Sequence, residues 1–152
     1  MKMGLIGISS LIILGDIYLV VALAWWILQI IANWRIFTKA GEAGWKSIIP
    51  VYSDYVSYKI AWQTGYFWLT VILSVISSVA QGFAEPNADN MMILTIVSLI
   101  RIIMAIISIM YSVKLARAFG RGIGFAIGLI FLQPIFMLIL GFGDDQYFGA
   151  DK

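Results

Sequence analysis

Apolar residues dominate four long stretches of the chain, and short polar segments separate them. The stretches cover about residues 11–32, 66–83, 91–113 and 123–142. Each is close to the ~20 residues that a membrane-spanning helix needs. Backbone polar groups find no water inside a bilayer, so a helix is the expected form of each stretch. The pattern therefore predicts an all-α membrane protein built as a bundle of four transmembrane helices.

The segment between the first two stretches is too polar to span a membrane and unusually aromatic. Its aromatic residues recur at steps of three, three and four, as Tyr52, Tyr55, Tyr58 and Trp62. This is helical spacing, and Pro50 suits a first helical turn. We therefore expect an interfacial amphipathic helix over about residues 50–63. Its aromatic face either sets the depth of the neighbouring helices or offers a docking surface for a partner or lipid headgroup.

Composition agrees with the hydrophobic pattern. Hydrophobic residues make up 62% of the chain and charged residues 12%, whereas a soluble domain has about 45–50% and about 25%. The 152 residues suit a single integral membrane domain over the whole chain. Cysteine and histidine are both absent. Their absence excludes disulfides, thiolate metal sites and imidazole acid–base chemistry.

Seven of the ten lysines and arginines lie in two alternate loops, and Lys2, Arg101 and Lys152 are the others. The seven follow the first and third apolar stretches, as Arg35, Lys39, Lys46, Lys59, Lys114, Arg117 and Arg121. The segment 85–90 carries acids and no cation, and the C-terminal tail is also rich in aspartate. Lysine and arginine accumulate in cytoplasmic loops. We therefore expect both basic segments in the cytoplasm and both termini outside.

Arg101 lies near the middle of the third apolar stretch, roughly 15 Å from either end. A charge at the bilayer midplane costs at least ~2.5 kcal/mol, so such a residue usually faces the protein interior and has a partner. Asp16 in the first stretch is the obvious candidate. The pair would lock the bundle as a fixed ion pair or take part in a proton or ion relay, unless the two residues do not meet at all.

Small and polar side chains recur at helical spacing in the other helices. The second helix carries Thr70, Ser74, Ser77 and Gln81 on one face, and Ser98 and Ser108 share the face of Arg101 on the third. The last helix contains two overlapping GxxxG patterns, formed by Gly120, Gly124 and Gly128. Small residues let membrane helices approach closely, and hydroxyls bond across the contact. These faces predict a polar interior that serves helix packing or, alternatively, a polar path through the bundle.

The chain contains no recognisable catalytic set. A membrane serine peptidase needs a serine and a lysine base on the same outer face, but apart from Lys2 and Lys152 every lysine maps to the cytoplasmic side. No spacing of acidic residues suggests a metal site. We therefore expect no enzymatic activity, no metal or other cofactor, and no nucleic-acid partner.

Two motifs resemble a bacterial family of small multi-pass membrane proteins of unknown function. The first is IFTKAGEAGWKSIIPVY at residues 36–52, and the second combines AFGRGIGFAIGL at residues 118–129 with ILGFG at residues 139–143. Members are sometimes labelled signal peptidase I, a label that the lysine placement contradicts. The resemblance implies a protein of the bacterial inner membrane and brings no catalytic residues.

The sequence leaves two functional hypotheses. The first is a non-enzymatic accessory or structural subunit, which contacts the lipid bilayer and either other membrane subunits or further copies of itself. Small-residue faces, aromatic anchors and the missing catalytic set favour it. The second is a small transporter or channel subunit that uses the polar interior around Asp16 and Arg101.

Overall fold

The computed structural model describes residues 2–83 and 91–150, with side chains from Leu14 onward in the first helix. Its elements are helices throughout the described ranges: α1 (Lys2–Lys39), the short 3-10 helix η1 (Gly44–Ser47), α2 (Pro50–Ala61), α3 (Thr64–Gly82), α4 (Met91–Ala118), α5 (Ile123–Phe131) and α6 (Gln133–Phe142). The predicted all-α fold is confirmed for these residues. The acidic segment 85–90 and the terminal residues Asp151 and Lys152 lie outside them.

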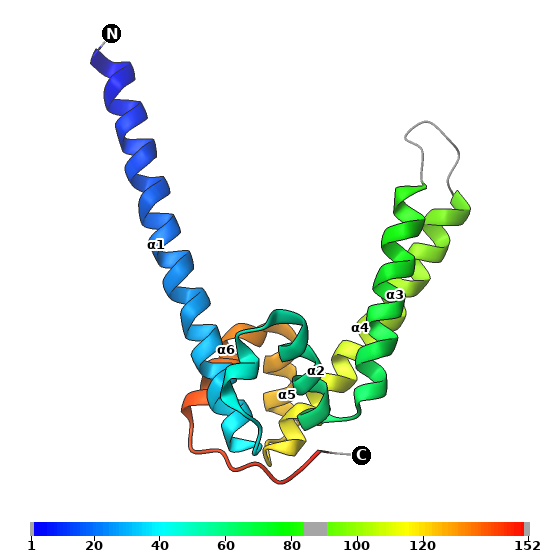
Figure 1. Ribbon diagram of the computed structural model, residues 1–152. Coiled ribbons are helices and arrows are strands. Elements are labelled where there is room, and N and C mark those ends of the chain that lie inside the picture. Colours follow the sequence, from blue (N-terminus) through cyan, green and yellow to red (C-terminus); the bar gives the residue numbers. More distant parts are fainter. Residues whose placement is uncertain (1, 84–90, 151–152) are drawn as a thin grey trace.

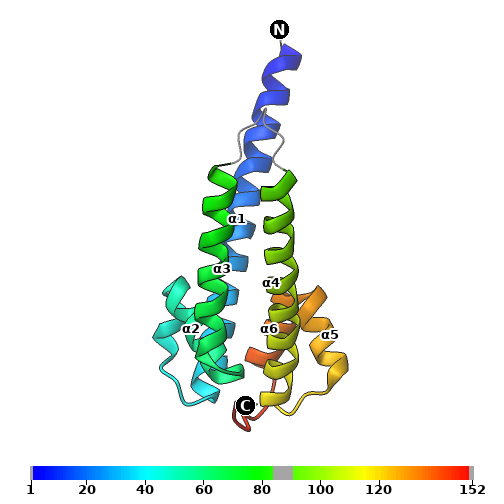
Figure 2. The same ribbon diagram turned by 90° about the vertical axis from the view of Figure 1, so that its right-hand side faces the viewer.

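The molecule consists of two arms that rise from a common base (Figure 1). One arm is α1 alone, and the other is the antiparallel pair α3 and α4, which lie side by side (Figure 2). The base contains η1, α2, α5, α6 and the ends of α1 and α4. Within the described residues α1 contacts α6, η1 and α2, but neither α3 nor α4. The helices therefore do not form the predicted four-helix bundle.

The hydrophobic core lies in the base. Its largest fully buried side chains are Ile36, Phe37, Val56, Leu115, Phe119, Leu129 and Leu140. They come from the last turns of α1 and α4, the residue after α4, and the three short helices. The arms, in contrast, expose rows of isoleucine, leucine, valine and tryptophan. Apolar side chains exposed along helices of membrane length need lipid or another protein to cover them.

Two glycines end the long helices in the same way. Gly41 and Gly120 both have a positive φ, +77° and +69°. The next residue in each case donates its N–H to a carbonyl five positions back, Glu42 to Phe37 over 2.8 Å and Arg121 to Ala116 over 2.8 Å. This is the Schellman arrangement, which favours glycine because the left-handed conformation strains residues with a Cβ. It sets the end of α1 at Lys39, beyond the predicted end near residue 32.

The predicted helix over residues 123–142 is broken. The chain forms α5 and α6, of 9 and 10 residues, with a non-helical Leu132 between them. Pro134 is the cause, because a continuous helix would need its missing N–H to bond the carbonyl four residues earlier, and its ring would clash with that carbonyl. Each piece is only about 15 Å long, half of the ~30 Å hydrocarbon core. Three described helices remain that are long and apolar enough to cross a membrane: Leu14–Lys39 within α1, Thr64–Gly82 and Met91–Ala118.

α5 and α6 pack against each other, so the tail after α6 returns to the end of α4. Phe148 N–H donates to the carbonyl of Ala118 over 2.8 Å, and Arg121 Nε donates to Asp145 Oδ1 over 2.7 Å. The N-terminal end of α1 lies at the opposite end of the molecule (Figure 1). The prediction that both termini lie outside needs a fourth crossing by residues 123–142, which form two short helices here, and it stays a prediction.

Candidate functional site

The structure does not bring Asp16 and Arg101 together. Asp16 lies on the free arm α1 and Arg101 on α4, and these two helices make no contact. Both side chains are exposed. The guanidinium of Arg101 instead lies 3.4 Å from the side-chain carbonyl of Gln81, near the end of α3. The predicted ion pair therefore does not form within one chain, because the arms diverge above the base.

The predicted polar face of α3 and α4 is largely satisfied by its own helices. The hydroxyls of Thr70, Ser74 and Ser98 donate to carbonyls three residues earlier, over 2.7–2.8 Å. Gln81 bonds the carbonyl and the hydroxyl of the buried Ser77. Hydroxyls bonded back to their own helix carry no polar link to a neighbour. Gln81 and Arg101 make a polar contact between the two helices, whereas the hydroxyls named here bond within their own helix.

The three glycines of the predicted GxxxG patterns have different roles. Gly120 ends α4, as described above. Gly128 faces the ring of Phe136 in α6 so closely that an added Cβ would lie 2.1 Å from it. Gly124 has open space around it. Only Gly128 packs helices as predicted, whereas the close approach of Gly141 to Ala32 between α6 and α1 was not predicted.

A polar cavity of about 200 Å³ lies in the base, between the roots of the two arms. It collects side chains from α1, α2, α4 and α6, which are Asn33, Ser53, Asp54, Ser57, Tyr58, Ser108, Tyr111, Gln133 and Met137. Of the polar residues predicted for the interior, only Ser108 lines it. A second cavity of similar size shares Asn33, Ser53 and Asp54 with the first. These three residues therefore stand between two hollows of the base.

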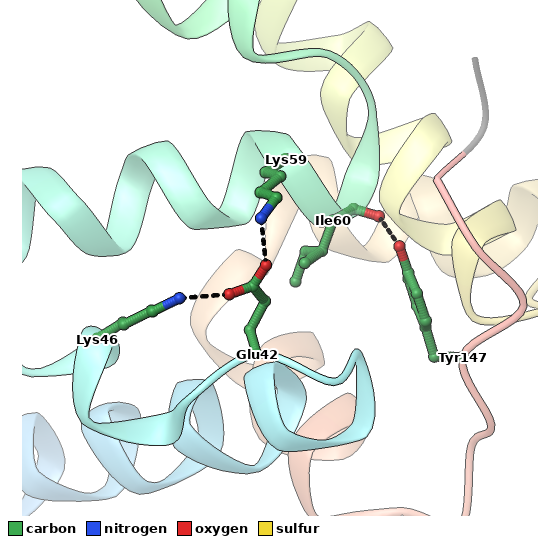
Figure 3. Close-up of polar contacts among 5 residues, drawn as sticks. All are labelled: Glu42, Lys46, Lys59, Ile60 and Tyr147. Atoms are coloured by element: carbon green, nitrogen blue, oxygen red, sulfur yellow. Dashed lines mark hydrogen bonds and ion pairs between the residues drawn. The ribbon is translucent and has the colours of Figure 1, made fainter.

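Asp54 is the acid of this cavity, and no lysine or arginine of the described residues is bonded to it. Its side chain is exposed, and partial loss of water around the carboxyl raises its pKa above the ordinary value of 3.8. The two lysines nearest in sequence are engaged elsewhere: Lys46 and Lys59 both bond the carboxylate of Glu42, over 2.5 and 2.6 Å (Figure 3). Asp54 therefore contributes an uncompensated negative charge to the cavity.

Asn33 adds an unsatisfied acceptor. Its side-chain oxygen is shielded from solvent and has no hydrogen-bond partner among the described residues. Leaving a buried acceptor without a donor costs about 1–3 kcal/mol. Such a group calls for a donor from a bound water or ligand. The cavity thus combines a free carboxylate, hydroxyls and amides with a buried oxygen that lacks a donor.

Polar bonds tie the segments of the base together. Hydrogen bonds from Lys46 and then Lys59 hold the pKa of Glu42 below its ordinary value. The hydroxyl of Tyr147 in the tail donates to the carbonyl of Ile60 over 2.9 Å (Figure 3). Lys39 Nζ donates to the carbonyls of Leu140 and Gly143, where α6 ends. A cation at the carbonyl end of a helix is favourable, so α1 and α6 are tied together there.

The sequence carried a partial signal for this site. Ser53, Asp54 and Ser57 share one side of α2 at steps of one and three. That side was overlooked in favour of the aromatic residues on the same helix. Asn33 and Gln133 belong to α1 and α6, and only the fold brings them to α2. No group of three acids suited to a metal ion exists among the described residues.

The molecule has helices of membrane length and apolar arms, and its described residues form no strand. These features are typical of helical membrane proteins. The family of unknown function DUF5684 matches residues 45–150, more than two thirds of the chain, and the chain belongs to this family. The match covers η1 to the tail and leaves out α1. No curated protein and no solved structure matches the chain.

Proposed function

We propose that the chain is a non-enzymatic membrane protein of the bacterial inner membrane, acting as an accessory or structural subunit of a larger complex. The observation that carries this proposal is the exposure of its arms. In the most apolar windows of α1, α3 and α4, 0%, 11% and 17% of residues are buried inside the molecule. Helices this open are available to other transmembrane helices as well as to lipid.

Polar residues on the arms support a protein partner over lipid alone. Arg101 is exposed on α4, and among the described residues its hydrogen-bond partner is Gln81, at 3.4 Å. Ionisable side chains within membrane helices almost always face a protein interior or a water-filled space. A neighbouring subunit would provide that interior, because α1 of the same chain diverges from α4.

The charge distribution supports a cytoplasmic base. Every lysine and arginine between residues 35 and 121 except Arg101 lies in or near the base, at the ends of α1 and α4 and around α2. By the positive-inside rule the base faces the cytoplasm. On this arrangement α2 lies at the interface, and α5 and α6 form a hairpin that enters the membrane only partly.

The test uses the absence of native cysteines. Val20→Cys places a thiol on the exposed face of α1, and Ala43→Cys places one on the exposed loop of the base as the matched control. We expect oxidation in membranes to crosslink the Val20→Cys variant to a second chain, and the native particle to exceed the mass of one chain. A monomer in mild detergent and in nanodiscs, with no crosslink at Val20→Cys, contradicts the proposal.

A second candidate function is a small transporter or channel subunit, and the polar cavity favours it. Such a function requires a polar interior, and the cavity provides one where Asp16 and Arg101 do not meet. Flux of protons or small cations across liposomes that contain the protein, reduced by Asp54→Asn, would support this candidate. Equal flux from liposomes with the wild type, the variant and no protein would remove it.

A further inference from the structure

We propose that the polar cavity of the base binds an ammonium group, in which Asp54 neutralises the charge and the surrounding oxygens accept the N–H bonds. This binding site is independent of whether the arms assemble with other helices. The argument rests on the charge of the cavity, its acceptors, its aromatic walls and its size.

Charge is the first requirement. Asp54 is the one carboxylate lining the cavity, and its neighbours on the lining carry no positive charge. Glu42 holds both Lys46 and Lys59, so the fold keeps these lysines away from Asp54. Asp54 is exposed at the edge of the cavity, so a ligand with a single positive charge gains its attraction, whereas a neutral ligand gains none and an anionic ligand is repelled.

The acceptors suit a donor with several N–H groups. An ammonium donates up to three hydrogen bonds. Beside Asp54, the lining offers the hydroxyls of Ser53, Ser57 and Ser108 and the side-chain amides of Asn33 and Gln133. The solvent-shielded oxygen of Asn33 lacks a donor in the described structure, and an ammonium supplies one.

The aromatic walls and the volume favour an organic ammonium over a metal ion. The rings of Tyr58 and Tyr111 lie 4.8 Å apart beside the cavity, and aromatic faces attract cations. One carboxylate is too few for a divalent ion, and no three-acid group exists in the described residues. A volume of about 200 Å³ exceeds what a single water or bare ion fills.

An ammonium group reaches the base of a membrane protein from two sources: a free amine in the cytoplasm or the ethanolamine headgroup of a lipid. The two sources are separated by purifying the full chain in nanodiscs of phosphatidylglycerol, which has no ammonium. Ethanolamine hydrochloride is then added against sodium chloride at equal ionic strength, and thermal unfolding is followed by tryptophan fluorescence. In a second experiment, phosphatidylethanolamine replaces half of the nanodisc lipid and no free amine is added.

We expect ethanolamine, or the phosphatidylethanolamine nanodisc, to raise the unfolding temperature beyond the effect of sodium. The experiment in which the unfolding temperature rises identifies the source of the ammonium group. Asp54→Asn should weaken the apparent Kd at least tenfold or abolish the shift, whereas Asp144→Asn, an exposed acid of the tail outside this cavity, should respond like the wild type. Ser57→Ala, which keeps the charge and removes one acceptor, should weaken binding several-fold and serves if Asp54→Asn does not fold.

Three results would overturn the proposal. One is an equal shift with ethanolamine and with sodium. Another is an unchanged shift in correctly folded Asp54→Asn and in Ser57→Ala. The third is a wild-type protein that responds to neither the free amine nor the ethanolamine lipid.

Discussion

The base of this molecule buries its apolar side chains, whereas the arms expose theirs. In the base, four short helices and the ends of α1 and α4 surround side chains such as Phe37 and Leu140, which have 0% exposure. Along α1, residues such as Leu19 are 60% exposed, although their composition is equally apolar. The base is therefore held together by its own core, whereas the arms depend on what surrounds them. Apolar composition alone does not tell which residues form a core.

The largest difference between the two regions is expected from truncating one apolar side chain in each. Phe37→Ala should lower the free energy of unfolding by about 3–5 kcal/mol, because it leaves a cavity in the packed base. Leu19→Ala, on the exposed arm, should cost less than about 1 kcal/mol. Thermal unfolding of both variants in the same detergent checks the difference. Equal losses would show that α1 is packed inside the molecule.

Two helical glycines sharpen the comparison at the junction of arm and base. A Cβ on Gly141 would lie 2.7 Å from the carbonyl oxygen of Ala32, whereas a Cβ on Gly124 meets nothing within 4 Å. Gly141→Ala should therefore push α6 away from α1 and cost about 1–3 kcal/mol. Gly124→Ala should be neutral or stabilise by up to about 1 kcal/mol, since alanine favours helix. If Gly141→Ala unfolds at the wild-type temperature, the two helices are not in contact.

The ion pairs of Glu42 give the base a pH dependence. Because the folded pKa of Glu42 is lowered, its stabilisation is complete above the ordinary value of 4.5 and is lost as the pH falls through the folded pKa. Glu42→Gln should cost on the order of 1 kcal/mol at neutral pH. The gap between variant and wild type should shrink as the pH falls below 4.5. A gap that persists unchanged down to pH 3 would assign the effect to something other than this carboxylate.

The smallest expected effect is the coupling between the two arms. Since α1 and α4 do not touch, the losses caused by Asp16→Asn and Arg101→Gln in a monomer should add within about 0.3–0.5 kcal/mol. A double-mutant cycle measured by thermal unfolding tests this additivity. A double variant that recovers part of either loss would reinstate the ion pair that the sequence suggested.

The sequence sufficed for helices with strong local signals. Pro50 and the spaced aromatic residues predicted α2, and the apolar runs predicted α3 and α4 to within a few residues, apart from the longer C-terminal end of α4. The break at Leu132 was not predicted because the run 123–142 is apolar apart from Gln133, although Pro134 was the available signal. The cavity was missed for a different reason. Asn33, Asp54 and Gln133 come from three distant elements, and no local pattern shows that a hairpin brings the last of them back to the base.

α5 and α6 double back in this fold, and we propose that three helices cross the membrane and that the tail lies at the basic end of the molecule. Single cysteines at Ala43, Met91 and Gln146 test it, since all three positions are exposed and native cysteine is absent. With a membrane-impermeant maleimide on intact and on opened cells, Ala43→Cys and Gln146→Cys should react only after opening, and Met91→Cys should react in intact cells. Labelling of Gln146→Cys together with Met91→Cys in intact cells would restore a fourth crossing and contradict this fold.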